Sequence, residues 1–238
     1  MPKGSNIRRL AGDPGIEVEL RRSARARRIT LRVSRRDGRV TLTLPTFVPE
    51  REAMDFAASR ADWVRGQLAQ VVAPHRLGIG DTVPVDGQDH RIEVAQSGRT
   101  AQLGDGVLMV PPRARDRIGP AVAAYFKTRA RDRLVAASDH YAAQLGRGYG
   151  RVSLRDTRSR WGSCSSEGNL MYSWRLAMAP VAVQNYVAAH EVAHLVEMNH
   201  SDRFWRVVAG LMPDYQTHRN WLRSHGGALQ AIDFGSDS

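Results

Sequence analysis

The sequence predicts an α+β protein in which a β-rich N-terminal lobe packs on a mainly helical C-terminal lobe. Over residues 15–112, hydrophobic residues mostly alternate with polar ones, which is typical of half-buried strands. From residue 113 to 238, hydrophobic residues recur mainly every three to four positions, as in helices. Pro111-Pro112 is the best linker candidate between the two patterns. Residues 1–14 have neither pattern and are expected to form a flexible tail.

Turn dipeptides separate the expected strands of the N-terminal lobe. Asp37-Gly38 predicts a hairpin, and similar dipeptides between residues 82 and 110 predict a small antiparallel meander. Helical spacing after Pro49 predicts one helix in this lobe, ending before Pro74. The predicted strands are 16–20, 29–33, 40–44, 83–85, 91–95, 101–103 and 107–110.

The C-terminal lobe begins with a long helical pattern over residues 115–145, which Gly146 ends. Residues 152–175 then read as strands around a turn at Glu167-Gly168, so we expect a small antiparallel sheet. A helix after Pro180 continues into three closely spaced histidines. The lobe therefore places a helix with metal-ligand side chains beside a small sheet.

The chain is strongly basic, with a net charge of +11, and arginine carries most of the positive charge. One cluster falls on the predicted hairpin of the N-terminal lobe. It has no interleaved aromatic residues, so it does not resemble a platform for stacking single-stranded nucleic acid. A solvated basic face and a surface for nucleic acid, a nucleotide or an acidic partner both remain open. The cluster comprises Arg21, Arg22, Arg25, Arg27, Arg28, Arg32, Arg35, Arg36 and Arg39.

The single cysteine, Cys164, excludes an intramolecular disulfide. The N-terminal residues lack the apolar segment of a secretory signal, and no apolar stretch approaches the roughly 18 residues of a membrane helix. We therefore expect a cytoplasmic protein that does not bind membranes.

The segment from His190 to His194 has the pattern H-E-x-x-H. Residues four apart lie on one face of a helix, so both imidazoles can reach the same cation. Glu191 follows the first histidine and cannot be a third ligand on that face. It can instead accept a proton from water that the metal activates. These residues predict a Zn²⁺ site with Glu191 as the general base.

A third ligand is expected because catalytic zinc sites usually have three protein ligands and one open position. His200 follows His194 by six residues, an interval found in zinc peptidases whose pattern has glycine where this chain has Glu197. The alternative is a solvent-facing loop histidine, since Ser201 and Asp202 look like the start of a helix. The lesser candidates for a ligand are Glu197, Asp202 and Asp214.

Several motifs together make the chain resemble the YgjP-like metallopeptidases, bacterial relatives of SprT-like and minigluzincin zinc proteins. The resemblance covers roughly residues 16–225 and includes the basic hairpin region 23–45. Ser173 stands where the family is expected to have Asn, so no role is assigned to it. The motifs are Arg160-Trp161-Gly162-Ser163-Cys164-Ser165, Trp174-Arg175-Leu176 with Pro180, His190-Glu191-x-x-His194-Leu195, Asn199-His200-Ser201 with Phe204-Trp205, and Trp221-Leu222.

The resemblance implies a zincin-like catalytic lobe in which Zn²⁺ is bound by His190, His194 and His200, with Glu191 catalytic. The motif that starts at Arg160 either lies beside the active-site helix along a substrate cleft or contributes Trp161 and Cys164 to the core. Cys164 is a small buried hydrophobe in one interpretation and a metal ligand or reactive thiol in another. Substrate or oxyanion contacts are conceivable, against a surface or core position, for Arg160, Tyr172, Arg175 and His218.

The predicted function is that of a zinc-dependent hydrolase, most simply a metallopeptidase. Water activated by zinc would attack a carbonyl, and Glu191 would take its proton and pass it to the leaving amine. Zinc-activated water also attacks phosphorus, so a hydrolase of a non-peptide substrate such as a nucleotide phosphoanhydride is an alternative. A third hypothesis is a nucleic-acid-associated SprT-like module whose zinc site supports structure or processes a bound partner.

Overall fold

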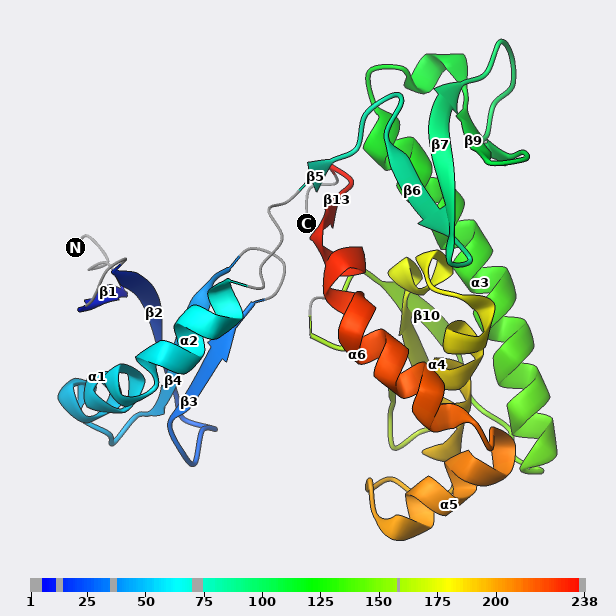
Figure 1. The fold of residues 1–238 in the computed structure, drawn as a ribbon. Coiled ribbons are helices and arrows are strands. Elements are labelled where there is room, and N and C mark those ends of the chain that lie inside the picture. The colour runs from blue at the N-terminus through cyan, green and yellow to red at the C-terminus, as the bar shows by residue number, and fades with distance from the viewer. Residues whose placement is uncertain (1–5, 12–14, 35–37, 70–74, 158, 236–238) are drawn as a thin grey trace. The chain divides into compact units, whose positions relative to one another are not determined.

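The computed structural model describes residues 6–11, 15–34, 38–69, 75–157 and 159–235. These residues form a mixed α+β structure with six α-helices and several small sheets, which confirms the α+β class (Figure 1). By their contacts, they divide into two compact units, residues 1–74 and 75–238. None of the described helices is long and apolar enough to cross a membrane.

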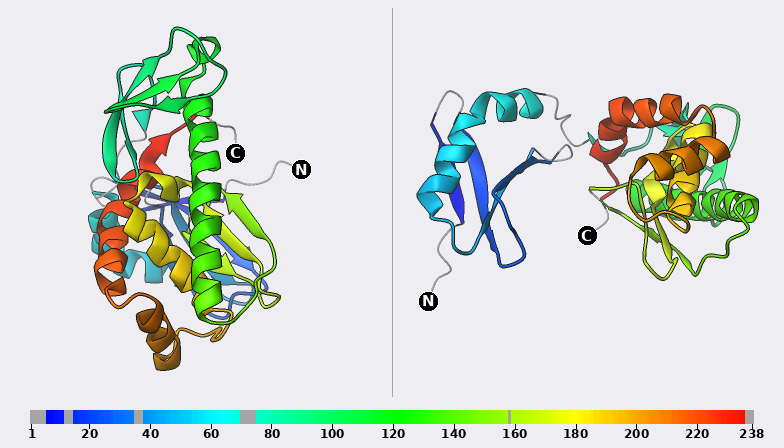
Figure 2. Two further views of the ribbon diagram at one scale, coloured as in Figure 1. Left: turned by 90° about the vertical axis from the view of Figure 1, so that its right-hand side faces the viewer. Right: turned by 90° about the horizontal axis from the view of Figure 1, so that it is seen from below.

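The unit of residues 1–74 is a four-stranded sheet with helices on one face (Figure 2). Its elements are β1 (Ile7–Leu10), β2 (Ile16–Ser23), β3 (Thr30–Val33), β4 (Val40–Pro45), α1 (Glu50–Ser59) and α2 (Ala61–Leu68). Val18 and Leu42 of the sheet are completely buried and belong to one core with Ala53 and Val64 of the helices. One helix was predicted, but two are observed because the backbone leaves the helical conformation at Arg60.

The second unit begins with a four-stranded sheet in the order β6-β7-β9-β8. Its strands are β6 (Thr82–Val85), β7 (Gln88–Val94), β8 (Gln102–Leu103) and β9 (Val107–Val110). The prediction of an antiparallel meander is wrong for one pair, because β7 and β9 run parallel. The hairpin of β8 and β9 inserts β9 next to β7, with β8 at the outer edge.

This sheet shares the core of the second unit, so the observed division falls after residue 74, whereas the lobe boundary was predicted after residue 112. The turn between β6 and β7 contacts the 3₁₀ helix η2 (Trp174–Met178). The N–H groups of Asp86 and Gly87 donate to two carbonyls of η2, at 2.9 and 3.0 Å. Backbone hydrogen bonds therefore tie the sheet to the helical part.

The helical part is built along the longest helix, α3 (Figure 2). Its other elements are α4 (Val181–Ala193), α5 (Asp202–Leu211), α6 (Tyr215–Ala231), β5 (His75–Arg76), β10 (Val152–Arg155), β11 (Gly162–Cys164), β12 (Leu170–Ser173) and β13 (Ile232–Asp233). Phe126 and Leu134 of α3 (Ile118–Gln144) are completely buried in the core that α4 shares. The sheet β10-β12-β11 was predicted to be antiparallel, but β10 and β12 are parallel because the chain crosses to the far edge before it returns.

Arg175 lies at the centre of the second unit with its side chain completely buried. Its Nε donates to Asp156 at 2.6 Å, and its Nη1 donates to the carbonyls of Leu229 and Ile232 at 3.0 and 2.8 Å. The guanidinium also lies 4.9 Å from the ring centroid of Phe234. One side chain thus joins η2, the loop after β10 and the end of α6.

Replacing Arg175 with Met should lower the free energy of unfolding by about 3 kcal/mol, because it removes the buried partner of an ion pair and leaves two carbonyls without their donor. Chemical denaturation measures this change. The exposed neighbour Arg155 is the control, and Arg155→Met should change stability by less than about 0.5 kcal/mol. Equal stability of Arg175→Met and the wild type would contradict the central role of Arg175.

Candidate metal centre

Three histidines converge where α4 ends. His190 is in the last turn of α4, His194 is its C-cap residue, and His200 lies just before α5. Their ring centroids are 4.8 to 5.1 Å apart, and one ring nitrogen of each lies within 4.8 Å of the other two. Among the described residues, these three histidines form a group that could hold a metal ion, and Glu197, Asp202, Asp214 and Cys164 are not part of it.

Local structure explains how the third histidine reaches the other two. Ser201 caps α5, because its Oγ accepts from the N–H of Phe204 at 3.4 Å, which confirms the predicted helix start. The completely buried ring of Phe204 lies between 4.5 and 4.9 Å, centroid to centroid, from the three imidazoles. Phe204 is therefore a shared apolar wall that links the start of α5 to the end of α4.

The backbone sets the tautomer of His194. Its Nδ1 lies 3.0 Å from the carbonyl oxygen of Glu197. A carbonyl can only accept, so Nδ1 carries the proton and Nε2 keeps its lone pair for a metal. Glu197 thus supports the site through its backbone, while its carboxylate lies 3.5 Å from Arg203.

The other two histidines also fit a bound cation. The Nε2 atoms of His190 and His200 are 3.0 Å apart, and the buried Nδ1 of His190 has no hydrogen-bond partner among the described residues. Burial, with the neighbouring His194, His200 and Arg219, lowers the pKa of His190 to about 3. Burial also lowers the pKa of His194. The neutral imidazole, which is the form that coordinates metals, is therefore favoured at His190 and His194.

Glu191 lies beside the histidines and is 5% exposed. Burial raises the pKa of its carboxyl to about 8, and the charge of Arg160 opposes that shift. The carboxyl group packs against Gly162 of β11 so closely that a Cβ on Gly162 would overlap the side chain of Glu191. This role of Gly162 was not predicted from the sequence, although the glycine stands in the motif that carried the family resemblance.

The remaining predicted site residues lie in different surroundings. Arg160 is exposed and close enough to influence Glu191 electrostatically. Tyr172 is completely buried, and its hydroxyl bonds to Ser138 at 2.9 Å. His218 pairs with Asp214 at 3.0 Å. Tyr172 and Arg175 are both completely buried and form hydrogen bonds within the fold. The substrate roles of Arg160, Tyr172, Arg175 and His218 remain predictions.

Cys164 is half-buried at the end of β11, and its thiol donates to the carbonyl of Ser165 at 3.4 Å. Burial and the nearby Glu191 raise its pKa to about 11, so the unreactive thiol form prevails. Trp161 packs against Gly226 of α6. Ser173 is completely buried, and its hydroxyl has no hydrogen-bond partner among the described residues.

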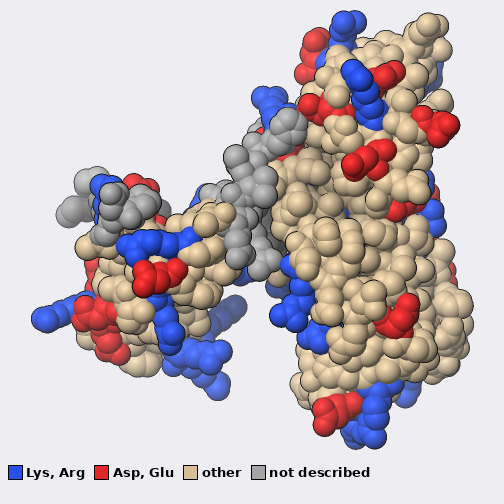
Figure 3. Space-filling model, viewed as in Figure 1, with Lys and Arg blue, Asp and Glu red and all other residues tan. Residues whose placement is uncertain are grey.

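The arginine cluster belongs to the unit of residues 1–74, where Figure 3 shows several basic side chains. Arg35 and Arg36 lie outside the described residues. Arg22 donates to the carbonyls of Thr46 and Val48, so it is partly engaged. The exposed members of the cluster are Arg21, Arg22, Arg25, Arg27, Arg28, Arg32 and Arg39.

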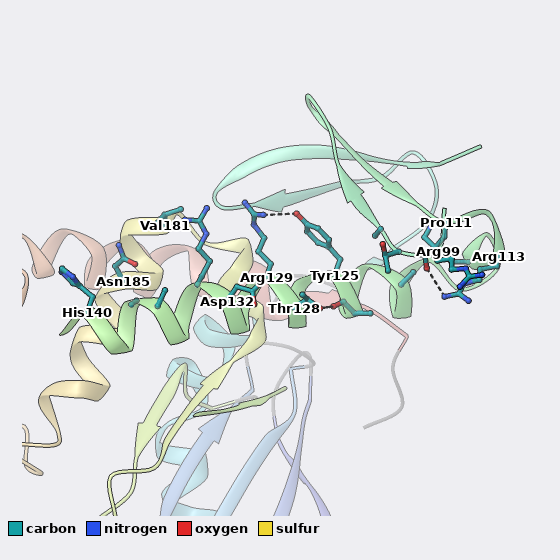
Figure 4. A pocket seen from close by; sticks show the side chains of 18 of the residues that line it. Arg99, Pro111, Arg113, Tyr125, Thr128, Arg129, Asp132, His140, Val181 and Asn185 are labelled. Carbon is teal, nitrogen blue, oxygen red and sulfur yellow. Dashed lines mark hydrogen bonds between the residues drawn. The ribbon is translucent and has the colours of Figure 1, made fainter. Parts of the chain in front are cut away.

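A separate groove of about 930 Å³ runs along α3 (Figure 4). Asn185 of α4 lines it. Asn185 and His190 are five residues apart, so their side chains leave the helix about 140° apart. The groove therefore lies on another side of α4 from the histidines. The carboxylate of Asp86 accepts from Arg129 and Arg133 near it, which holds this surface together.

Comparison with known families agrees with this geometry. Residues 27–225 match the model of the YgjP-like family, described as a YgjP-like metallopeptidase domain. The chain belongs to the YgjP-like family. As a YgjP-like protein it is a peptidase-like hydrolase, and its family implies a bound metal ion.

Other comparisons add little to this assignment. The crystal structure of the metallopeptidase zymogen of Pyrococcus abyssi abylysin is 20% identical to this YgjP-like chain, with a TM-score of 0.36. The match covers 42% of this chain and 99% of abylysin. A comparison with curated proteins gave no match.

Replacing His194 with Ala should abolish stoichiometric metal binding in this YgjP-like protein, because two imidazoles remain of a three-ligand set. Elemental analysis of protein purified after exposure to zinc measures the metal content. His140→Ala is the matched control, since His140 is exposed on α3 and should leave the metal content unchanged. An unchanged metal content in His194→Ala would refute its role as a ligand.

Proposed function

We propose that this protein is a zinc-dependent metallopeptidase in which Glu191 is the general base. The observation that carries the proposal is the close grouping of three imidazoles with one buried carboxyl group, that of Glu191 on α4. Three imidazoles and an open fourth position are a ligand set of catalytic zinc, whereas calcium and magnesium prefer oxygen ligands. The donor chemistry thus supports zinc as the metal ion that the family implies.

Bound zinc supplies a Lewis acid that polarises the scissile carbonyl and makes water easier to deprotonate. Glu191 holds the proton between the two halves of the reaction. A carboxyl group with a pKa near 8 is a good acceptor and donor close to neutral pH, because it neither binds nor releases the proton too strongly. Glu191 then passes this proton to the leaving amine.

The position of β11 favours a peptide over a small anhydride as the substrate. In the sheet β10-β12-β11, this strand is at the edge and pairs with β12 on one side only. An edge strand presents backbone donors and acceptors that an extended peptide can pair with. Gly162 of β11 also contacts Glu191, so a peptide paired there would lie near the proposed base.

Glu191→Gln should keep its zinc but lose hydrolysis by a factor of about 10² to 10⁴, because the amide cannot accept the proton. A screen of peptides and nucleotides, run on both proteins with zinc content measured in parallel, tests this expectation. Glu197→Gln is the matched control, because Glu197 contributes its backbone carbonyl to His194, and this variant should retain activity. Normal turnover by Glu191→Gln would refute the role of Glu191 as the general base. Cleavage of nucleotides alone would favour a phosphoanhydride hydrolase.

Gly162→Ala should reduce hydrolysis about tenfold or more while the metal is retained, because the added methyl displaces the Glu191 carboxyl. Kinetics and metal analysis of the same preparation separate the two effects. At Gly148, a Cβ meets nothing within 4 Å, so Gly148→Ala should behave like the wild type. Full activity in Gly162→Ala would show that the close packing does not position Glu191.

A further inference from the structure

Arg219 of α6 is a cation near the three histidines that lacks a counter-ion among the described residues. Arg219 is half-buried. Within the part of the chain that the structure describes, Arg219 forms no ion pair and donates no hydrogen bond to another residue. A partly buried guanidinium without an acceptor is unfavourable, because burial removes water that would otherwise solvate the charge. Such a group is well suited to bind an anionic ligand.

Aromatic contacts hold Arg219 beside the histidines. Its guanidinium carbon lies 4.4 Å from the ring centroid of Trp205, within the range of a cation–π interaction. Trp205 in turn lies 5.7 and 5.9 Å, centroid to centroid, from His190 and His200. Tyr215 stacks on the same indole at 5.4 Å. The position of Arg219 is therefore coupled to the metal centre by one shared aromatic ring.

The charge of Arg219 also reaches the active-site helix. After burial and the two other histidines, it is a further cause of the lowered pKa of His190. Burial raises the pKa of Tyr186 to about 12, against the opposing effect of Arg219, so the hydroxyl keeps its proton. The Tyr186 ring lies 6.0 Å from that of His190. The guanidinium of Arg219 and the ring of Tyr186 thus both lie near His190.

The nearby carboxylates do not neutralise Arg219. Asp214, one turn earlier than His218, pairs with that histidine. Glu197 lies near Arg203, and Glu191 is buried on α4 with Arg160 as its electrostatic partner. None of these described carboxylates pairs with Arg219, so its guanidinium is available to an anionic ligand.

We propose that Arg219, with Trp205 and Tyr186, forms a subsite that binds an anionic group of the substrate next to the metal centre. This inference rests on the proposed function, because it assumes that the substrate binds at the three histidines. The planar guanidinium suits either a carboxylate or a phosphate, because both accept two parallel hydrogen bonds. For a peptide, the anion is an acidic side chain or the C-terminal carboxylate.

The first experiment measures binding without hydrolysis. Succinate and inorganic phosphate are titrated separately into wild-type, Arg219→Met and Arg219→Lys protein, each metal-free and zinc-loaded. Arg219→Met should bind the preferred anion about ten- to a hundredfold more weakly, and Arg219→Lys should recover part of this loss because it keeps the charge. Zinc content should be the same in all three proteins.

Arg206→Met is the matched control, since Arg206 is exposed on α5 next to Trp205 and its loss changes the net charge equally. Anion binding should be unaffected by it. Weakened succinate binding identifies a carboxylate subsite and weakened phosphate binding a phosphate subsite. Equal binding by wild type and Arg219→Met, or an equal loss in Arg206→Met, would overturn the proposal.

The second experiment links the subsite to catalysis through matched substrates. Peptides that the wild type cleaves are compared as Glu and Gln pairs, and as free and amidated C-termini. Arg219→Met should lower kcat/KM about tenfold or more for the charged member, mainly through KM, and little for the neutral one. A wild type that cleaves no peptide would refute the proposed function, whereas equal losses for both members would refute the subsite.

Discussion

The buried guanidinium of Arg175 is the constraint on which the second unit depends. A charge with no exposure to solvent persists only where fixed acceptors replace water, and Asp156 with two backbone carbonyls supplies them. These acceptors come from the loop after β10 and from the end of α6. Since η2 lies just before α4, the ion pair also holds the segment that precedes the histidine-bearing helix. The position of the candidate metal centre thus depends on the contacts of Arg175, which lie outside it.

At the other end of α4, small and apolar residues determine the geometry of the site. Gly162 lets the carboxyl of Glu191 lie against β11, and Phe204 supports all three imidazoles from the opposite element. Neither residue carries chemistry of its own. Their importance lies in the space that they leave or fill, and a site of this kind tolerates little change in volume around it.

The sequence predicted what depends on local geometry and missed what depends on strand pairing. His190, Glu191 and His194 could be placed together because helical periodicity relates them, and the family motifs pointed to His200. Periodicity does not determine the neighbours of a short strand, so the parallel pairs β7–β9 and β10–β12 were not foreseen. The core position of Arg175 was equally hidden, since an arginine in a motif resembles a substrate contact until its acceptors are known.

The three histidines differ in when they become available during folding. His190 and His194 are brought together by one helical turn, so a two-ligand half of the site can exist as soon as α4 forms. His200 joins only when Phe204 has docked and α5 is in place. If the three histidines bind a metal as proposed, its affinity depends on the docking of α5, and the ion links α4 to α5. Metal binding and the docking of α5 would then be coupled, so a chelator that removes the metal would also loosen α5.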